Sequence, residues 1–132
     1  MKITQALNQS LPDEMLSLLQ AMGRVAAGQN IHLYLVGGAA RNCFIKQATV
    51  DIDLTSAAPV MQLVELFTVQ LGAQLIQHSQ FQTAKMLIAG KAVDLATHRS
   101  EEYLRPGSLP QIRAGTLMED LNRRDFTVNA LA

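Results

Sequence analysis

The chain has 132 residues, 48% of them hydrophobic, which is enough for one domain with a real core and excludes a wholly disordered protein. Eleven Lys and Arg balance eleven Asp and Glu, and the two signs also balance within residues 1–30, 31–98 and 99–132 taken separately. No section therefore offers the basic stripe that a polyanion needs, and nucleic acid is not expected as the main partner.

The lone Cys43 allows no internal disulfide. No run reaches the roughly 18 apolar residues of a membrane span, and the N-terminus lacks the apolar core of a signal peptide. We expect a soluble, cytoplasmic protein with no membrane partner.

The first half of the chain predicts two helices and two strands. An amphipathic helix is expected over residues 10–28, capped by Ser10, with an apolar stripe on one face. A strand over 31–36 ends at Gly37-Gly38, and a short helix over 39–47 precedes a strand over 50–54. The residues of the stripe are Met15, Leu18, Leu19, Met22 and Val25.

The second half begins with a helix that starts at Pro59 and ends at Gly72. A strand over 74–77 and a hairpin of strands 83–89 and 91–97, turning at Gly90, follow. Residues 98–122 contain Pro106, Gly107, Pro110 and Gly115 and predict a long loop, and 126–132 predict the start of a helix. This order indicates an α/β (α+β) domain with one mixed sheet flanked by helices.

Acidic residues in two of these strands are candidates for metal binding. Within a strand, Asp51 and Asp53 would point to one face about 6.5–7 Å apart and could share Mg²⁺. Two acids at a solvated strand end are the commoner explanation of such a triplet. Asp94 lies between Val93 and Leu95, so it is expected on the opposite face from them, beside the first two acids. Three acids on one face would repel one another strongly without a cation.

Glycines and arginines supply candidate contacts to a phosphate. Gly37 and Gly38 lie between a strand and a helix, where backbone N–H groups can approach an anion, and Arg41 is expected on the first turn of that helix. A tight turn without a ligand is the alternative. Arg123 and Arg124 precede the last predicted helix and suit a triphosphate, while Asp125 is equally an ordinary N-cap.

Four segments carry these residues: LYLVGGAARN (33–42), DIDLTS (51–56), VDLATHRSEEY (93–103) and LMEDLNRRDFTVNALA (117–132). Together they resemble the head domain of the class II tRNA nucleotidyltransferases (CCA-adding enzymes) and bacterial poly(A) polymerases. Twelve residues separate Gly38 from Asp51, and Asp94 fits the third acidic position of that superfamily. The resemblance implies a polymerase-β-like fold and Mg²⁺-dependent transfer of CMP or AMP from CTP or ATP to a tRNA 3′ end.

The resemblance also implies a role for each site residue. Asp51 and Asp53 match the acids that bind catalytic Mg²⁺, and Asp94 matches the third catalytic carboxylate. The nucleotide-binding residues of the family correspond to Gly37, Gly38, Arg41, Arg123, Arg124 and Asp125. In domain terms it implies a head domain over 1–132, with an N-terminal helix region at 1–30. A catalytic core would follow over 31–122, with a mobile loop near 98–122, and the neck helix would start over 123–132. The neck, body and tail domains that hold tRNA are expected outside this chain, with a partner chain as a possible source.

Two positions depart from the pattern of the family. Asn42 stands where the family usually has Asp, and Ala40 where it usually has a larger branched residue. A non-catalytic or split nucleotide-binding module therefore remains an alternative, as does a poly(A) polymerase head. A nucleotidyltransferase acting on a small molecule or a protein is a weaker alternative, which the RRDFTVNALA segment disfavours. CCA addition, A addition, C addition and polyadenylation are not separated, because the residues that select the base belong to the neck.

Overall fold

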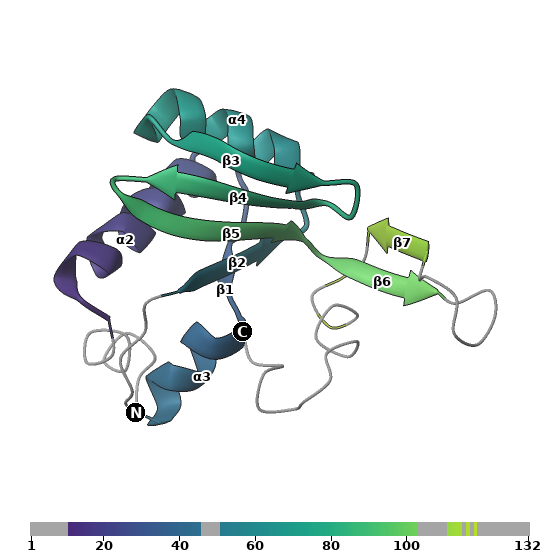
Figure 1. Ribbon diagram of the computed structural model, residues 1–132, viewed down its shortest axis with the longest axis horizontal. Coiled ribbons are helices and arrows are strands. Elements are labelled where there is room, and N and C mark those ends of the chain that lie inside the picture. Colours follow the sequence, from purple (N-terminus) through teal and green to yellow (C-terminus); the bar gives the residue numbers. More distant parts are fainter. Residues whose placement is uncertain (1–10, 46–50, 103–110, 115, 117, 119–132) are drawn as a thin grey trace.

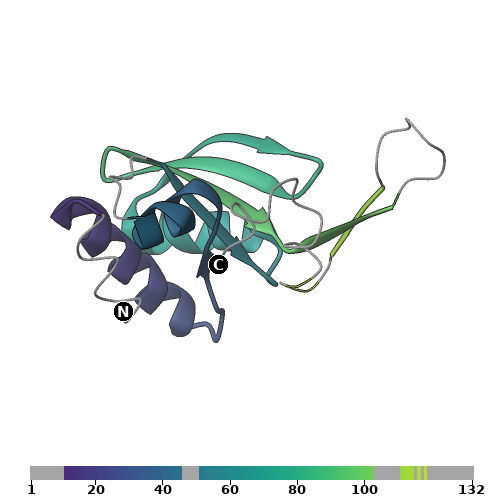
Figure 2. The same ribbon diagram turned by 90° about the horizontal axis from the view of Figure 1, so that it is seen from below.

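A mixed sheet with helices packed on it forms the body of the molecule (Figures 1 and 2). The computed structural model describes residues 11–45, 51–102, 111–114, 116 and 118. The helices are α2 (Asp13–Ala27), α3 (Gly37–Ile45) and α4 (Val60–Leu71). The main sheet contains β1 (Tyr34–Leu35), β2 (Ile52–Ser56), β3 (Gln74–Ser79), β4 (Thr83–Ile88) and β5 (Lys91–Thr97). This architecture confirms the predicted α/β class. No helix in the described ranges is long and apolar enough to cross a membrane.

The strand order β1-β2-β5-β4-β3 places two strands side by side that are far apart in the sequence. β2 and β5 run parallel, and every other neighbouring pair in this sheet is antiparallel. A parallel pair needs a long crossover, which α4, β3 and β4 supply here. Asp53 is the register partner of Asp94 in this pair.

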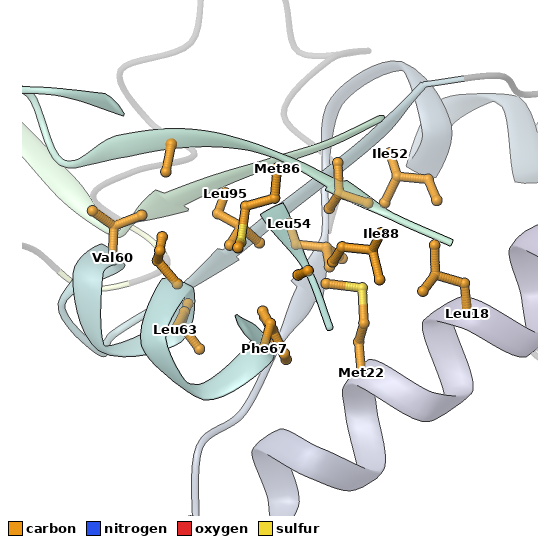
Figure 3. Close-up of a cluster of buried hydrophobic side chains, with 14 of the residues drawn as sticks. Leu18, Met22, Ile52, Leu54, Val60, Leu63, Phe67, Met86, Ile88 and Leu95 are labelled. Atoms are coloured by element: carbon orange, nitrogen blue, oxygen red, sulfur yellow. The ribbon is translucent and has the colours of Figure 1, made fainter. Parts of the chain in front are cut away.

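The core lies between one face of the sheet and the helices α2 and α4. Strands β4 and β5 alternate buried with more exposed residues, as a sheet covered on one face requires. Figure 3 shows side chains of both helices and of the central strands pointing toward one another. The largest completely buried members are Phe67, Met22, Leu63 and Met86, each with 0% of its surface exposed. The opposite face of the sheet remains for polar residues.

Helix α4 confirms its prediction at both ends, whereas α2 confirms it only at the C-terminal end, where Gly28 follows the last helical residue. Pro59 precedes α4, and Gly72 ends it with a φ of 64°, a left-handed conformation that glycine adopts without steric cost. Helix α2 begins at Asp13, with Pro12 at the N-cap and no side-chain cap, so the predicted start at Ser10 is wrong. Proline disfavours helical backbone in the residue before it, which explains why the helix starts after Pro12.

Smaller corrections concern the strands and helix around Gly37. β1 covers only Tyr34–Leu35 of the predicted 31–36. After it, a φ of 68° at Gly37 turns the chain into α3. α3 therefore begins two residues earlier than predicted. β2 begins at Ile52 and ends at Ser56, so the prediction of 50–54 was displaced toward the N-terminus. The β4–β5 hairpin turns at Gly90 as predicted.

The segment over 98–122 is not the single long loop that its Pro and Gly content predicts. It contains β6 (Arg99–Glu102) and β7 (Gln111–Ala114), which pair in a second, antiparallel sheet. This pair extends from the end of β5 away from the main sheet (Figure 1). Each Pro and Gly of the segment falls between the two strands or after them, so these residues mark the connections and not the whole segment. The predicted helix over 126–132 lies outside the described residues.

Candidate functional site

Asp53 and Asp94 lie opposite each other on the exposed face of the sheet. They are register partners in the parallel pair β2–β5, and neighbouring strands are about 4.8 Å apart. Their neighbours along both strands are buried in the core, so the two carboxylates point to the other face. The side chain of Asp94 is 48% exposed and that of Asp53 is partly buried. The structure thus brings together two acids that are 41 positions apart in the sequence.

Asp51 occupies a different position from the one predicted. It lies directly before β2, is exposed, and does not share a strand with Asp53, so the expected spacing within one strand does not apply. No three His, Cys, Asp or Glu side chains within the described ranges are grouped closely enough to hold a metal ion by themselves. Mg²⁺, however, usually takes only one or two carboxylates and completes its shell with water and substrate phosphates. The pair Asp53 and Asp94 fits this requirement chemically.

The junction between β1 and α3 packs directly against Asp53. The Val36 N–H donates a hydrogen bond to the Asp53 carbonyl oxygen at 2.9 Å. Gly37 is close enough to the side chain that a Cβ at this position would lie 3.3 Å from Asp53 Oδ2. The first turn of α3 therefore begins beside the carboxylate pair. Backbone N–H groups at a helix start attract anions, so this junction suits a phosphate bound next to the acids.

Arg41 adds a positive charge on the same helix, on its second turn and not on the first as predicted. Its Nη2 atom lies 3.6 Å from the position that a Cβ on Gly38 would take, so the guanidinium folds back toward the helix start. The Nε–H donates to Asn42 Oδ1 at 3.2 Å. Because Asn42 is an amide, this hydrogen bond orients Arg41 without neutralising its charge. Arg123, Arg124 and Asp125 lie outside the described residues.

Lys85 is a member of this site that the sequence analysis missed. Its Nζ atom lies 3.7 Å from Asp94 Oδ1, and the two residues are register partners in the hairpin β4–β5. The turn at Ala89 and Gly90 would have revealed this pair, since a two-residue turn fixes the register of the whole hairpin. A pocket of about 430 Å³ opens over the same face. The residues that line it are Val36, Asp53, Leu54, Gln77, His78, Ser79, Thr83, Ala84, Lys85, Asp94, Leu95 and Ala96.

The sequence from residue 33 to 132 matches the family model described as the poly A polymerase head domain. The chain belongs to this poly A polymerase head family. Its match covers the glycine pair, the carboxylates and the segment that contains Arg124, so the resemblance proposed from the motifs is confirmed at the level of the family.

Curated relatives of this head family are tRNA nucleotidyltransferases. An A-adding tRNA nucleotidyltransferase of Halalkalibacterium halodurans is 34% identical over 127 residues, which are 96% of this chain and 30% of the relative. A CC-adding tRNA nucleotidyltransferase of Deinococcus radiodurans is 39% identical over 107 residues, or 80% of this chain and 29% of the relative. The chain thus spans about 30% of the length of these two relatives.

A solved CCA-adding enzyme without ligand has the same fold. It superposes with a TM-score of 0.88 at 29% identity, over 98% of this chain and 31% of the solved chain. The polymerase-β-like head fold implied by the motifs is therefore confirmed.

Proposed function

We propose that this chain is the catalytic head of a tRNA nucleotidyltransferase. In this proposal it transfers AMP or CMP from ATP or CTP to the 3′ end of a tRNA, when joined to the domains that make up the rest of its relatives. The observation that carries the proposal is the register pair Asp53 and Asp94, with the backbone of Gly37 packed against the first acid. This places acids for a cation and N–H groups for phosphates next to each other.

Each described residue has a separate task in this proposal. Asp53 and Asp94 would hold Mg²⁺, which supplies positive charge to the triphosphate and to the attacking 3′-hydroxyl. A metal contact by Asp51 stays a prediction. The N–H groups at Gly37 and Gly38 would bind phosphate oxygens, and Arg41 would neutralise charge that develops during phosphoryl transfer. Arg123 and Arg124 toward the triphosphate, and Asp125 toward the ribose, stay predictions.

The choice between A and C addition is proposed to lie outside this head. The same chain aligns with an A-adding and with a CC-adding relative at 34% and 39% identity. We therefore expect the head to bind ATP and CTP with similar affinity. The grip on tRNA is assigned to other domains, since the formal net charge of the chain is zero. The expected cytoplasmic location stays a prediction.

Titration of ATP and CTP, with and without Mg²⁺, tests the carboxylate site. Asp53→Asn keeps the shape of the side chain and removes its charge, and Asp13→Asn is the matched control in the first turn of α2. We expect Mg²⁺ to strengthen nucleotide binding to the wild type and to Asp13→Asn, and we expect Asp53→Asn to lose about tenfold or more, the scale of one charge-assisted contact. Equal, Mg²⁺-dependent binding by all three proteins would contradict the proposal.

A non-catalytic nucleotide-binding module is the second candidate, and the bond from Arg41 to Asn42 favours it. The side chain of Asn42 is a neutral amide, so it cannot form an ion pair with Arg41 or act as an acid or base. An aspartate at this position could do both. The two candidates differ when the chain is incubated with Mg²⁺, labelled CTP or ATP and tRNA that lacks its 3′ end. Incorporation of label would exclude the module. Nucleotide binding without any incorporation, even after the remaining domains are supplied, would favour it.

A further inference from the structure

The side of the pocket formed by β3 and β4 has no role in the function proposed above. The strand order places β1, with Gly37 after it, on one side of the carboxylate pair and places β4 and β3 on the other. On that second side, Lys85 is the register partner of both Asp94 and Gln77, and Ser79 is the partner of Thr83. A row of polar side chains thus continues from the carboxylates to the edge of the sheet.

Lys85 is available for a ligand in spite of its ion pair. Its side chain is 47% exposed and that of Asp94 is 48% exposed, at an N–O distance of 3.7 Å. An exposed pair of this kind contributes little to stability, because solvent screens it and both side chains lose freedom. The Lys85 ammonium can therefore exchange its ion pair with Asp94 for one with a phosphate at little cost in free energy. The same movement would leave Asp94 open to a cation.

Two hydroxyl groups next to Lys85 add hydrogen-bond donors. Ser79 Oγ and Thr83 Oγ1 lie 2.8 Å apart, and the Phe81 N–H donates to Ser79 Oγ at 3.1 Å. One of the two hydroxyl groups donates its proton to the other, so the second hydroxyl can donate to an oxygen of a ligand. Among the described residues that line the pocket, His78 supplies the aromatic ring, and there is no Phe, Tyr or Trp. The ammonium of Lys85 and the two hydroxyls suit phosphate and ribose groups, which every RNA acceptor shares.

Nucleotide transfer needs two substrates on opposite sides of the carboxylates. The donors proposed for the triphosphate, at Gly37, Gly38 and Arg41, all lie on the α3 side. We propose that Lys85, with the hydroxyls of Ser79 and Thr83, binds the terminal phosphate and ribose of the acceptor RNA, independent of its bases. This inference rests on the proposed function and adds a positioning residue for the acceptor to it.

Fluorescence anisotropy with a labelled single-stranded RNA tetranucleotide that has a free 3′-hydroxyl tests the inference on this chain. Lys85→Ala is compared with Lys91→Ala, a lysine of the same hairpin whose Nζ pairs with Glu14 at 3.3 Å and which does not line the pocket. We expect Lys85→Ala to weaken RNA binding roughly three- to tenfold, as the loss of one phosphate contact does. The salt dependence, as the slope of log K against log salt concentration, should become shallower by about 0.7, the value for one contact to a single strand.

The same proteins are titrated with Mg²⁺ and CTP. We expect all of them to bind CTP within twofold of the wild type, and Lys85→Arg to recover RNA binding. RNA affinity equal in wild type and Lys85→Ala, or no measurable RNA binding by the wild type, would overturn the inference. A loss of CTP binding by Lys85→Ala as large as its loss of RNA binding would also overturn it, by placing Lys85 on the triphosphate. These outcomes differ from a failure of the proposed function, in which Asp53→Asn would bind CTP as tightly as the wild type.

Discussion

Replacing Gly37 with alanine tests whether the close approach of the β1–α3 junction to Asp53 matters for nucleotide binding. Two effects of this substitution can be separated from the structure. The φ of 68° at Gly37 is unfavourable for any residue with a Cβ, and the new methyl group would lie 3.3 Å from Asp53 Oδ2. Gly72 has a similar φ of 64°, but nothing lies within 4 Å of its Cβ position. Gly72→Ala therefore reproduces the backbone strain without the contact to the acid.

The backbone strain predicts a similar loss of stability for both variants. A left-handed conformation costs an L-residue about 1–2 kcal/mol, so the free energy of unfolding should fall by that amount in each. The contact predicts a loss of function for Gly37→Ala alone, because the carboxylate must move by a few tenths of an ångström. A displaced carboxylate loses part of its contact with the cation, so this shift should weaken binding of ATP in the presence of Mg²⁺ roughly three- to tenfold, or about 0.7–1.4 kcal/mol.

Urea denaturation measures the stability, and calorimetric titration of ATP in the presence of Mg²⁺ measures the binding. Gly72→Ala should bind as tightly as the wild type once the fraction of folded protein is taken into account. The reasoning is refuted if Gly37→Ala and Gly72→Ala have the same affinity for the nucleotide.

Two further predictions concern the scaffold that holds the site. Phe67→Ala removes a side chain that is 0% exposed and should lower the free energy of unfolding, measured by urea denaturation, by about 3–5 kcal/mol. Val69 is 72% exposed on the same helix, so Val69→Ala should change this free energy by less than about 0.5 kcal/mol. Ala89→Asn should raise the melting temperature, because Ala89 has a φ of 49° before Gly90, and Asn tolerates this conformation better by roughly 0.5–1 kcal/mol. An unchanged melting temperature would show that the turn stores no strain at this position.

Helix α4 and the β4–β5 hairpin, whose signals are local, were predicted correctly from the sequence. Helix α4 has a proline before it, a glycine after it and an apolar stripe between them, so both of its ends follow from residues within one turn. The β4–β5 hairpin follows from two alternating runs around Gly90. The same local reasoning failed at β6 and β7, where Pro and Gly residues in a long connection concealed two strands of four residues each.

The geometry of the site depends on pairing between distant strands, which local patterns do not contain. Alternation showed that Asp94 points away from the core, yet the position of Asp53 opposite it follows from a register set by a crossover through α4, β3 and β4. The position of Asp51 depends on where β2 starts, and a shift of two residues in that boundary removed it from the strand. Lys85 differs from these acids, because its register to Asp94 lies within the β4–β5 hairpin and follows from the local turn at Ala89 and Gly90.

The zero net charge of the chain limits its partners less than it first suggests. Composition averages over the whole surface, whereas a substrate is bound by a few charges at fixed positions, here Asp53, Asp94 and Arg41 for the nucleotide and Lys85 for the acceptor. What neutrality still excludes is a broad basic face. With one or two lysine or arginine contacts to a single strand, the slope of log K against log salt should be only about −0.7 to −1.4, as each contact adds about −0.7. A much steeper slope for this chain would mean that RNA binds a surface of the head other than the pocket beside Asp94.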